Sequence, residues 1–157
     1  MLTLVRDDGY ELSTDPARVD VDRVHRWLST DAYWALGRPR ETTVRAIAGS
    51  LTFGVYRPGD LVQVAFCRMV TDGATFAWLG DVYVDPAERG RGLGSWLVAS
   101  ARDEVAARGV RRILLVTADA HEVYARLGFT APARPDQMME LDLRVVATDV
   151  DDTATGT

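Results

Sequence analysis

The chain has 157 residues, of which 47% are hydrophobic and 26% are charged, values typical of one soluble globular domain. Its 23 acidic residues outnumber its 18 basic ones, and the net charge of -5 argues against a general binder of nucleic acid or anionic membranes. The single cysteine, Cys67, excludes a disulfide framework within the chain. Because no apolar run approaches the roughly 18 residues of a membrane span and no signal-peptide pattern is visible, we expect a cytoplasmic protein.

The first part of the chain predicts a hairpin followed by two helices. Residues 2–5 and 10–12 are candidate strands joined by a turn at Asp8-Gly9. Residues 20–28 combine an acidic first turn with apolar side chains three and four positions apart, as in an amphipathic helix. A second helix is expected over residues 41–49, and its inward-facing side chains are predicted to be Val44, Ile47 and Ala48.

Three segments with high β propensity follow, and turn sequences separate them. They span residues 51–56, 61–70 and 76–84, so they predict an antiparallel meander. Gly80, inside the third segment, indicates a bulge or a close backbone approach.

The last part of the chain alternates helices and strands. A long amphipathic helix is expected from Leu93 to about Gly109, which stands where a C-cap belongs. It is followed by a buried strand over residues 112–116, a short helix over residues 120–127 and a closing strand over residues 138–143.

This order of elements predicts an α/β fold in a single domain over residues 1–146. Its sheet should be mixed, mostly antiparallel and flanked by helices. Residues 147–157 are small, polar and acidic, so we expect them to form a disordered tail.

A glycine-rich loop joins the third strand of the meander to the long helix. In Arg89-Gly90-Arg91-Gly92-Leu93-Gly94 the glycines let the backbone bend and approach a ligand, and the helix start presents free N–H groups. The arginines add donors suited to phosphate, so we expect an anion site, most naturally for a pyrophosphate. The loop lacks the Gly-Lys-Ser/Thr ending of an ATP-binding loop and the spacing of a dinucleotide fingerprint. A glycine-rich turn with solvated arginines remains the structural alternative.

Two motifs give the chain a family resemblance. Arg89-x-x-Gly92-x-Gly94, preceded by Asp81-Val82-Tyr83-Val84-Asp85-Pro86, resembles the acetyl-CoA motif of the GNAT superfamily of N-acetyltransferases. Residues 120–129, where Tyr124 precedes Gly128-Phe129, are similar to a late helix of that family. The likeness covers roughly residues 20–145, and shorter segments such as Tyr33-Trp34 are similar to a bacterial subfamily.

The resemblance implies acetyl transfer to a primary amine, which attacks acetyl-CoA directly in a ternary complex without a metal. The backbone of Val82, Tyr83 and Val84 is then expected to pair with the pantetheine amides, and a main-chain N–H near Val84 to stabilise the oxyanion. The pyrophosphate is expected at the loop residues Arg89, Gly90, Arg91, Gly92, Leu93, Gly94 and Ser95.

The resemblance also suggests side chains for the chemistry. Tyr124 is the candidate general acid for the departing thiolate, with a core aromatic as the alternative. Asp81 and His121 are candidate general bases, and an ordered water is the alternative to both. Instead of acting as a base, Asp81 could be a structural residue that binds turn amides. His121 could instead cap the helix or remain solvated. Asp119 is expected to be the N-cap of the short helix.

Tyr33 and Trp34, which lie between chain breakers, are expected to line the acceptor site, whereas Trp27 and Cys67 are expected in the core. The acceptor should be a small-molecule or peptide amine. Many members of the resembled family dimerise through their C-terminal strands, so a homodimer is a further expectation. The alternatives are a non-catalytic acyl-CoA-binding regulatory module and a structural α/β domain without a CoA site.

Overall fold

The computed structural model describes residues 1–144, so the predicted tail over residues 147–157 lies outside the described part. The six strands form one sheet in the order of the chain. They are β1 (Thr3–Val5), β2 (Glu11–Ser13), β3 (Leu51–Tyr56), β4 (Gln63–Thr71), β5 (Ala77–Val84) and β6 (Ile113–Leu114). The α-helices of this region are α1 (Val21–Thr30), α2 (Arg40–Ala48), α3 (Leu93–Ala107) and α4 (His121–Arg126).

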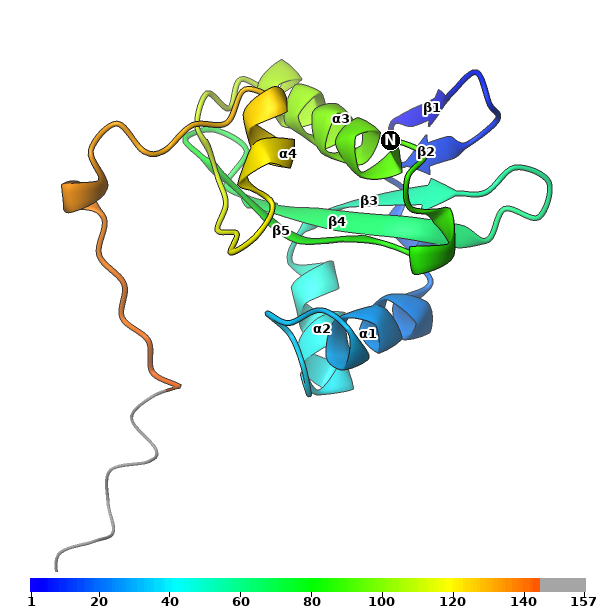
Figure 1. The fold of residues 1–157 in the computed structure, drawn as a ribbon, viewed down its shortest axis with the longest axis horizontal. Helices are drawn as coiled ribbons and strands as arrows, with labels where there is room; N and C mark the ends of the chain where they lie inside the picture. Colours follow the sequence, from blue (N-terminus) through cyan, green and yellow to red (C-terminus); the bar gives the residue numbers. More distant parts are fainter. Residues whose placement is uncertain (145–157) are drawn as a thin grey trace, which may run out of the picture.

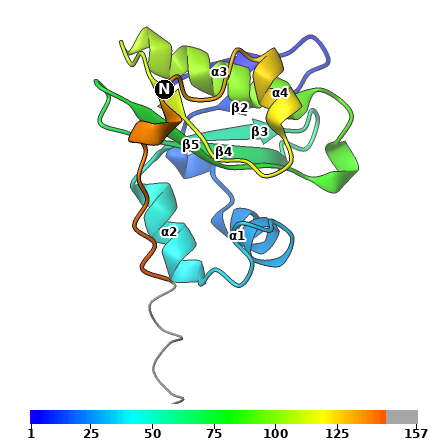
Figure 2. The same cartoon turned by 60° about the vertical axis from the view of Figure 1, so that its left-hand side comes forward.

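The helices cover both faces of the sheet. Figure 1 shows α3 and α4 on one face and α1 and α2 on the other, and Figure 2 shows the same two layers from the side. Strands β1 to β5 pair antiparallel, and β6 pairs parallel to β5. The predicted α/β class with a mixed, mostly antiparallel sheet is therefore confirmed. None of the described helices is long and apolar enough to span a membrane.

Two apolar clusters hold these layers together. Between the sheet and α3, fully buried side chains such as Phe53 and Leu97 form the larger cluster. On the other face, Val24 and Leu28 of α1 pack against Phe66. The predicted core positions of Trp27 and Cys67 are confirmed, since Trp27 is 7% exposed and Cys67 is fully buried. Burial also raises the pKa of the Cys67 thiol, as expected for an inert side chain.

The inward face of α2 differs from the prediction. Thr43 and Ile47 are buried, whereas Val44 is 37% exposed and Ala48 faces outward too. Both pairs have the four-residue spacing of one helix face, so spacing alone does not separate them. The polar Thr43 is buried because its hydroxyl meets the His25 ring nitrogen at 3.3 Å.

A bulge interrupts β5 beside Gly80, as predicted. Gly80 pairs with Arg68 and Tyr83 with Phe66, so Asp81 and Val82 together oppose the single residue Cys67. The left-handed backbone falls on Asp81, with φ of 52°, and not on the glycine. Aspartate is one of the few residues with a side chain that adopts this conformation with some ease.

The predicted strand over residues 112–116 is shorter and more exposed than expected. Only Ile113 and Leu114 pair with β5, and both are half-buried. Val116 is 79% exposed. A continuous apolar run usually indicates a strand buried on both faces, but here the chain leaves β5 after Leu114, and the run ends in solvent.

The predicted closing strand over residues 138–143 is wrong, because the structure has no strand there. Met139 is 97% exposed, Leu141 81% and Leu143 71%. Figure 1 shows this segment running away from the sheet. A segment with alternating apolar residues forms a strand only where a neighbouring strand pairs with it. Within residues 1–144 no strand pairs with this segment.

The short helix is confirmed as α4, but its predicted N-cap is wrong. The cap position is Ala120, not Asp119, and no side chain caps this helix start. The Thr117 hydroxyl instead accepts a hydrogen bond from the Ala120 N–H at 3.1 Å.

Candidate active site

A cavity of about 560 Å³ opens beside the end of β5. Its walls come from the connection after α1, the residues Val82–Val84, the start of α3, and α4. Strand pairing on this side ends with Trp78 and Leu114, so the following edge of β5 has no partner strand in the described chain. Along such an edge the backbone groups that lack a partner are free to bind an extended ligand, whereas the Val84 carbonyl already accepts a hydrogen bond from Arg89.

The glycine loop lies at one end of this cavity. Gly90 and Gly92 adopt left-handed backbone with φ of 78° and 72°, which a side chain would strain. Gly92 is the N-cap of α3 and offers no side-chain cap, so the N–H groups of the first turn stay available to an anion. A Cβ at Gly94 would lie 3.4 Å from the Val84 side chain, which shows how closely α3 approaches β5.

The loop arginines have protein partners. The Nε of Arg89 donates to the Val84 carbonyl at 3.0 Å, and the Nε of Arg91 lies 3.3 Å from the buried carboxylate of Glu88. Arg6, in the turn between β1 and β2, donates to the Arg91 carbonyl at 3.0 Å. Arg6 was missed by the sequence analysis, because no local pattern signals a contact across this distance in the chain.

Asp81 is the centre of a buried ion cluster. Its carboxylate accepts hydrogen bonds from the Trp34 indole N–H, twice from Arg38 and once from Arg68, at distances from 2.6 to 3.1 Å. Burial by itself would raise the pKa of Asp81. The hydrogen bonds and positive charges of the two arginines outweigh that effect and hold the pKa below its usual value.

The structure separates the other predicted catalytic residues. Tyr124, on α4, lines the cavity and contacts Phe129 edge to face, with ring centroids 5.8 Å apart. Burial raises the pKa of Tyr124 to about 12. His121 is exposed at the first position of α4 and lines a second groove, beside β6, which shares Tyr124 with the cavity. The geometry thus brings Tyr124 to the cavity and leaves His121 outside it.

Both predicted acceptor-site aromatics lie in the connection between α1 and α2. Trp34 lines the cavity and is 41% exposed. Tyr33 packs edge to face on Trp34, with centroids 4.9 Å apart. Its hydroxyl accepts a hydrogen bond from the Ala118 N–H at 3.0 Å. Tyr33 therefore ties this connection to the segment that precedes α4.

Two side chains of the site were missed by the sequence analysis. Arg68 is the one charged residue of strand β4 and has apolar neighbours on both sides, a pattern that itself signals a buried partner. Asp31 lines the cavity from the C-terminal end of α1, where the helix dipole disfavours a negative charge. Both positions carry a detectable sign, but the partner of each comes from a distant part of the chain.

The fold and the cavity define an α/β protein in which a glycine loop for anions adjoins an open strand edge. Residues 21–129 match the Acetyltransferase (GNAT) family, so the chain belongs to this family of acetyltransferases. A protein of Gibberella zeae, itself assigned as an acetyltransferase only by prediction, is 34% identical over 137 residues, which cover 74% of this chain and 76% of the relative.

Solved structures show the same fold. A protein of Xanthomonas campestris pv. campestris, assigned to the GNAT family, has a TM-score of 0.81 and 42% identity over 89% of this chain and 97% of its own. A predicted acetyltransferase of Clostridium acetobutylicum, crystallised with acetyl-CoA, has a TM-score of 0.64 and 18% identity over 87% of this chain and 96% of its own.

We expect Asp81→Asn to lower the free energy of unfolding by about 3 kcal/mol at pH 7, because two buried guanidinium groups lose their counter-charge. The lowered pKa means that the wild-type ion pairs stabilise the fold above the unfolded-state value of about 3.9 and lose that effect as the pH falls further. The difference between the two proteins, measured by urea unfolding, should therefore shrink below about pH 4. Asp60→Asn, which removes an exposed partner of Arg57, is the control and should change little. Equal effects of the two changes would contradict a structural role for Asp81.

Proposed function

We propose that this protein is an acetyl-CoA-dependent N-acetyltransferase in which a primary amine attacks the thioester directly within a ternary complex. The observation that carries the proposal is one cavity bounded by both an unpaired strand edge and an uncapped helix start. The first suits the amides of the pantetheine arm, and the second suits a pyrophosphate.

Donor binding rests mainly on the backbone. The exposed edge at Val82, Tyr83 and Val84 pairs with the pantetheine amides, and residues 89–95 hold the pyrophosphate. The left-handed glycines of this loop support the assignment, because they let the main chain approach a ligand closely. The contacts of Arg89 with Val84 and of Arg91 with Glu88 hold the loop in place before the donor arrives.

In the proposed reaction the amine nitrogen forms a bond to the thioester carbonyl carbon, and the carbon–sulfur bond breaks. A main-chain N–H near Val84 stabilises the negative oxygen of the intermediate. Tyr124 donates its phenolic proton to the leaving thiolate. Burial raises the pKa of Tyr124 to about 12, so at neutral pH the hydroxyl carries a proton that it can donate as negative charge develops on the sulfur.

The amine must also lose a proton, and we propose that an ordered water in the cavity accepts it. Two observations favour water over the side chains that the sequence suggested. The Asp81 carboxylate is occupied by three donor residues and has a lowered pKa, which makes it a weak proton acceptor. His121 is exposed and does not line the cavity, although the neighbouring groove that it lines shares Tyr124 with the cavity. Asp81 then acts as a positioning residue that orients Trp34.

A non-catalytic acyl-CoA-binding module is the competing function. It would need the strand edge and the loop, but it would have no use for a tyrosine beside the thiol site. The presence of Tyr124 in the cavity favours the enzyme.

Bulk at Gly94 should weaken donor binding without unfolding the protein. In Gly94→Leu the new side chain points toward Val84 and fills the space between α3 and β5. We expect calorimetry to show at least about a tenfold loss of acetyl-CoA affinity, equivalent to about 1.4 kcal/mol. Ala107→Leu, in the exposed last turn of the same helix, is the matched control. Unchanged binding by Gly94→Leu would reject the assigned donor slot.

Removing the Tyr124 hydroxyl should slow turnover and spare donor binding. We expect Tyr124→Phe to lower kcat by about a hundredfold, within the usual range for a general acid, at unchanged acetyl-CoA affinity. Because the pKa of Tyr124 is about 12, wild-type kcat should show no decline from its ionisation up to pH 10. Tyr56→Phe, which alters a hydroxyl bonded to the Arg18 carbonyl, is the control. An unchanged kcat in Tyr124→Phe would remove the tyrosine from the mechanism.

We also propose that the protein is a homodimer whose C-terminal segments pair between two copies. The alternation of the exposed Met139, Leu141 and Leu143 supports this, because it would place three apolar side chains on one face of a strand. A second copy would cover apolar surface that the described part of the chain leaves in solvent.

Leu141→Asp should therefore shift the protein from dimer to monomer in sedimentation experiments, because it places a charge in an apolar interface. Leu61→Asp is the control, since Leu61 is 54% exposed in the turn between β3 and β4 and has a backbone φ of 53° that aspartate tolerates. A monomeric wild type, or a dimer indifferent to Leu141→Asp, would overturn this proposal.

A further inference from the structure

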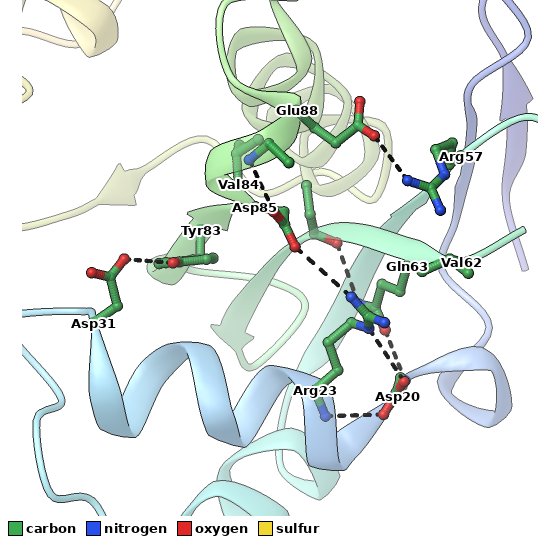
Figure 3. A network of polar contacts seen from close by, with 12 residues as sticks. Asp20, Arg23, Asp31, Arg57, Val62, Gln63, Tyr83, Val84, Asp85 and Glu88 are labelled. Carbon is green, nitrogen blue, oxygen red and sulfur yellow. Dashed lines mark hydrogen bonds and ion pairs between the residues drawn. The ribbon is translucent and has the colours of Figure 1, made fainter.

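Asp31 occupies the mouth of the cavity on the face of the sheet that carries α1 and α2. It follows the last residue of α1, and its Oδ2 accepts a hydrogen bond from the Tyr83 hydroxyl at 2.5 Å (Figure 3). The side chain is 55% exposed. Since Tyr83 projects from β5 itself, this bond places the carboxylate beside the strand edge assigned to the donor.

The carboxylate is held where it costs the fold free energy. A negative charge at the C-terminal end of a helix opposes the helix dipole. Among the residues that the structure describes, Asp31 is the only acid that lines this cavity. Its Oδ1 accepts no hydrogen bond from the described residues, so one oxygen remains free for a ligand. The Asp81 carboxylate, by contrast, is neutralised by Arg38 and Arg68.

Trp34 adds a second feature that favours a cation. Its indole ring lines the same cavity, and the hydrogen bond to Asp81 together with the edge contact to Tyr33 holds it in one orientation. An indole is the aromatic side chain that attracts cations most strongly. A carboxylate and an indole in one cavity therefore select for positive charge.

Arg89 is the charge that opposes this selection. It lines the cavity as well, and its Nη2 lies 3.6 Å from Asp31 Oδ2. The pyrophosphate of the donor, placed at the loop that Arg89 begins, would bring negative charge next to this guanidinium and offset it. With the donor bound, the positive charge of Arg89 no longer offsets the negative charge of Asp31, and the carboxylate can bind a cation of the acceptor.

We propose that Asp31 is the residue that selects the acceptor and that the acceptor is a diamine. One amine attacks the thioester, while the second, protonated amine binds the Asp31 carboxylate beside Trp34. This inference rests on the proposed acetyltransferase function and adds the substrate class to it. The net charge of -5 acts in the same direction, because it raises the local concentration of cations around the protein.

The kinetic test compares 1,4-diaminobutane with butylamine, which has the same carbon chain and no second charge. For the wild type we expect kcat/KM to be at least about tenfold higher for the diamine, because butylamine lacks the charge-assisted hydrogen bond to Asp31. Asp31→Asn should remove this preference, because it raises the KM for the diamine far more than the KM for butylamine. Asp103→Asn, on the exposed side of α3, is the control and should retain the preference. Equal use of the two amines by the wild type, or a preference that survives Asp31→Asn, would overturn the proposal.

A binding measurement separates this inference from the proposed function. We expect 1,4-diaminobutane to bind at least about tenfold more tightly to the wild type than to Asp31→Asn, with each protein saturated with CoA beforehand. Binding that depends on Asp31 without any turnover would support the inference and count against the enzyme. Turnover of butylamine without a diamine preference would support the enzyme and reject the inference.

Discussion

The carboxylate of Asp81 joins three separate parts of the chain, and the wall of the cavity that follows α1 depends on it. Trp34 and Arg38 come from the connection between α1 and α2, whereas Arg68 comes from β4. Without Asp81, each guanidinium group would be a buried charge with no counter-charge. Without the two arginines, the Asp81 carboxylate would be in the same state. Because the three groups are satisfied only together, the connection after α1 is held against the sheet in one position.

The same residue forms the bulge in β5, and the bulge arranges the strand that both halves of the site share. Beyond it, Val82 and Val84 pack toward the cluster under α3, whereas Tyr83 packs with Trp27 on the side of α1. One short stretch of backbone thus has a face toward the glycine loop and a face toward Asp31. A donor bound along this edge and an acceptor arriving from the α1 side would meet at the same strand.

Most elements and the glycine loop were predictable, because their signals are local. The helical spacing of residues 20–28, the turn residues between strands and the glycines before Leu93 each act over a few positions. Asp31 and Arg68 were missed because their partners, Tyr83 and Asp81, lie far along the chain. The orientation of α2 and the strand over residues 138–143 failed for a related reason: the patterns suited either outcome, and packing decided between them.

By itself, the sequence determined the α/β class, the order of the elements as far as α4, the bulge near Gly80 and the glycine loop before α3. Each follows from propensity, periodicity or backbone freedom, which are properties of neighbouring residues. Only the tertiary structure decided that Asp81 faces two arginines, that Tyr124 shares a cavity with Trp34 while His121 does not, and that Asp31 meets Tyr83. These are contacts between distant segments, and their geometry depends on how sheet and helices pack, which no local pattern encodes.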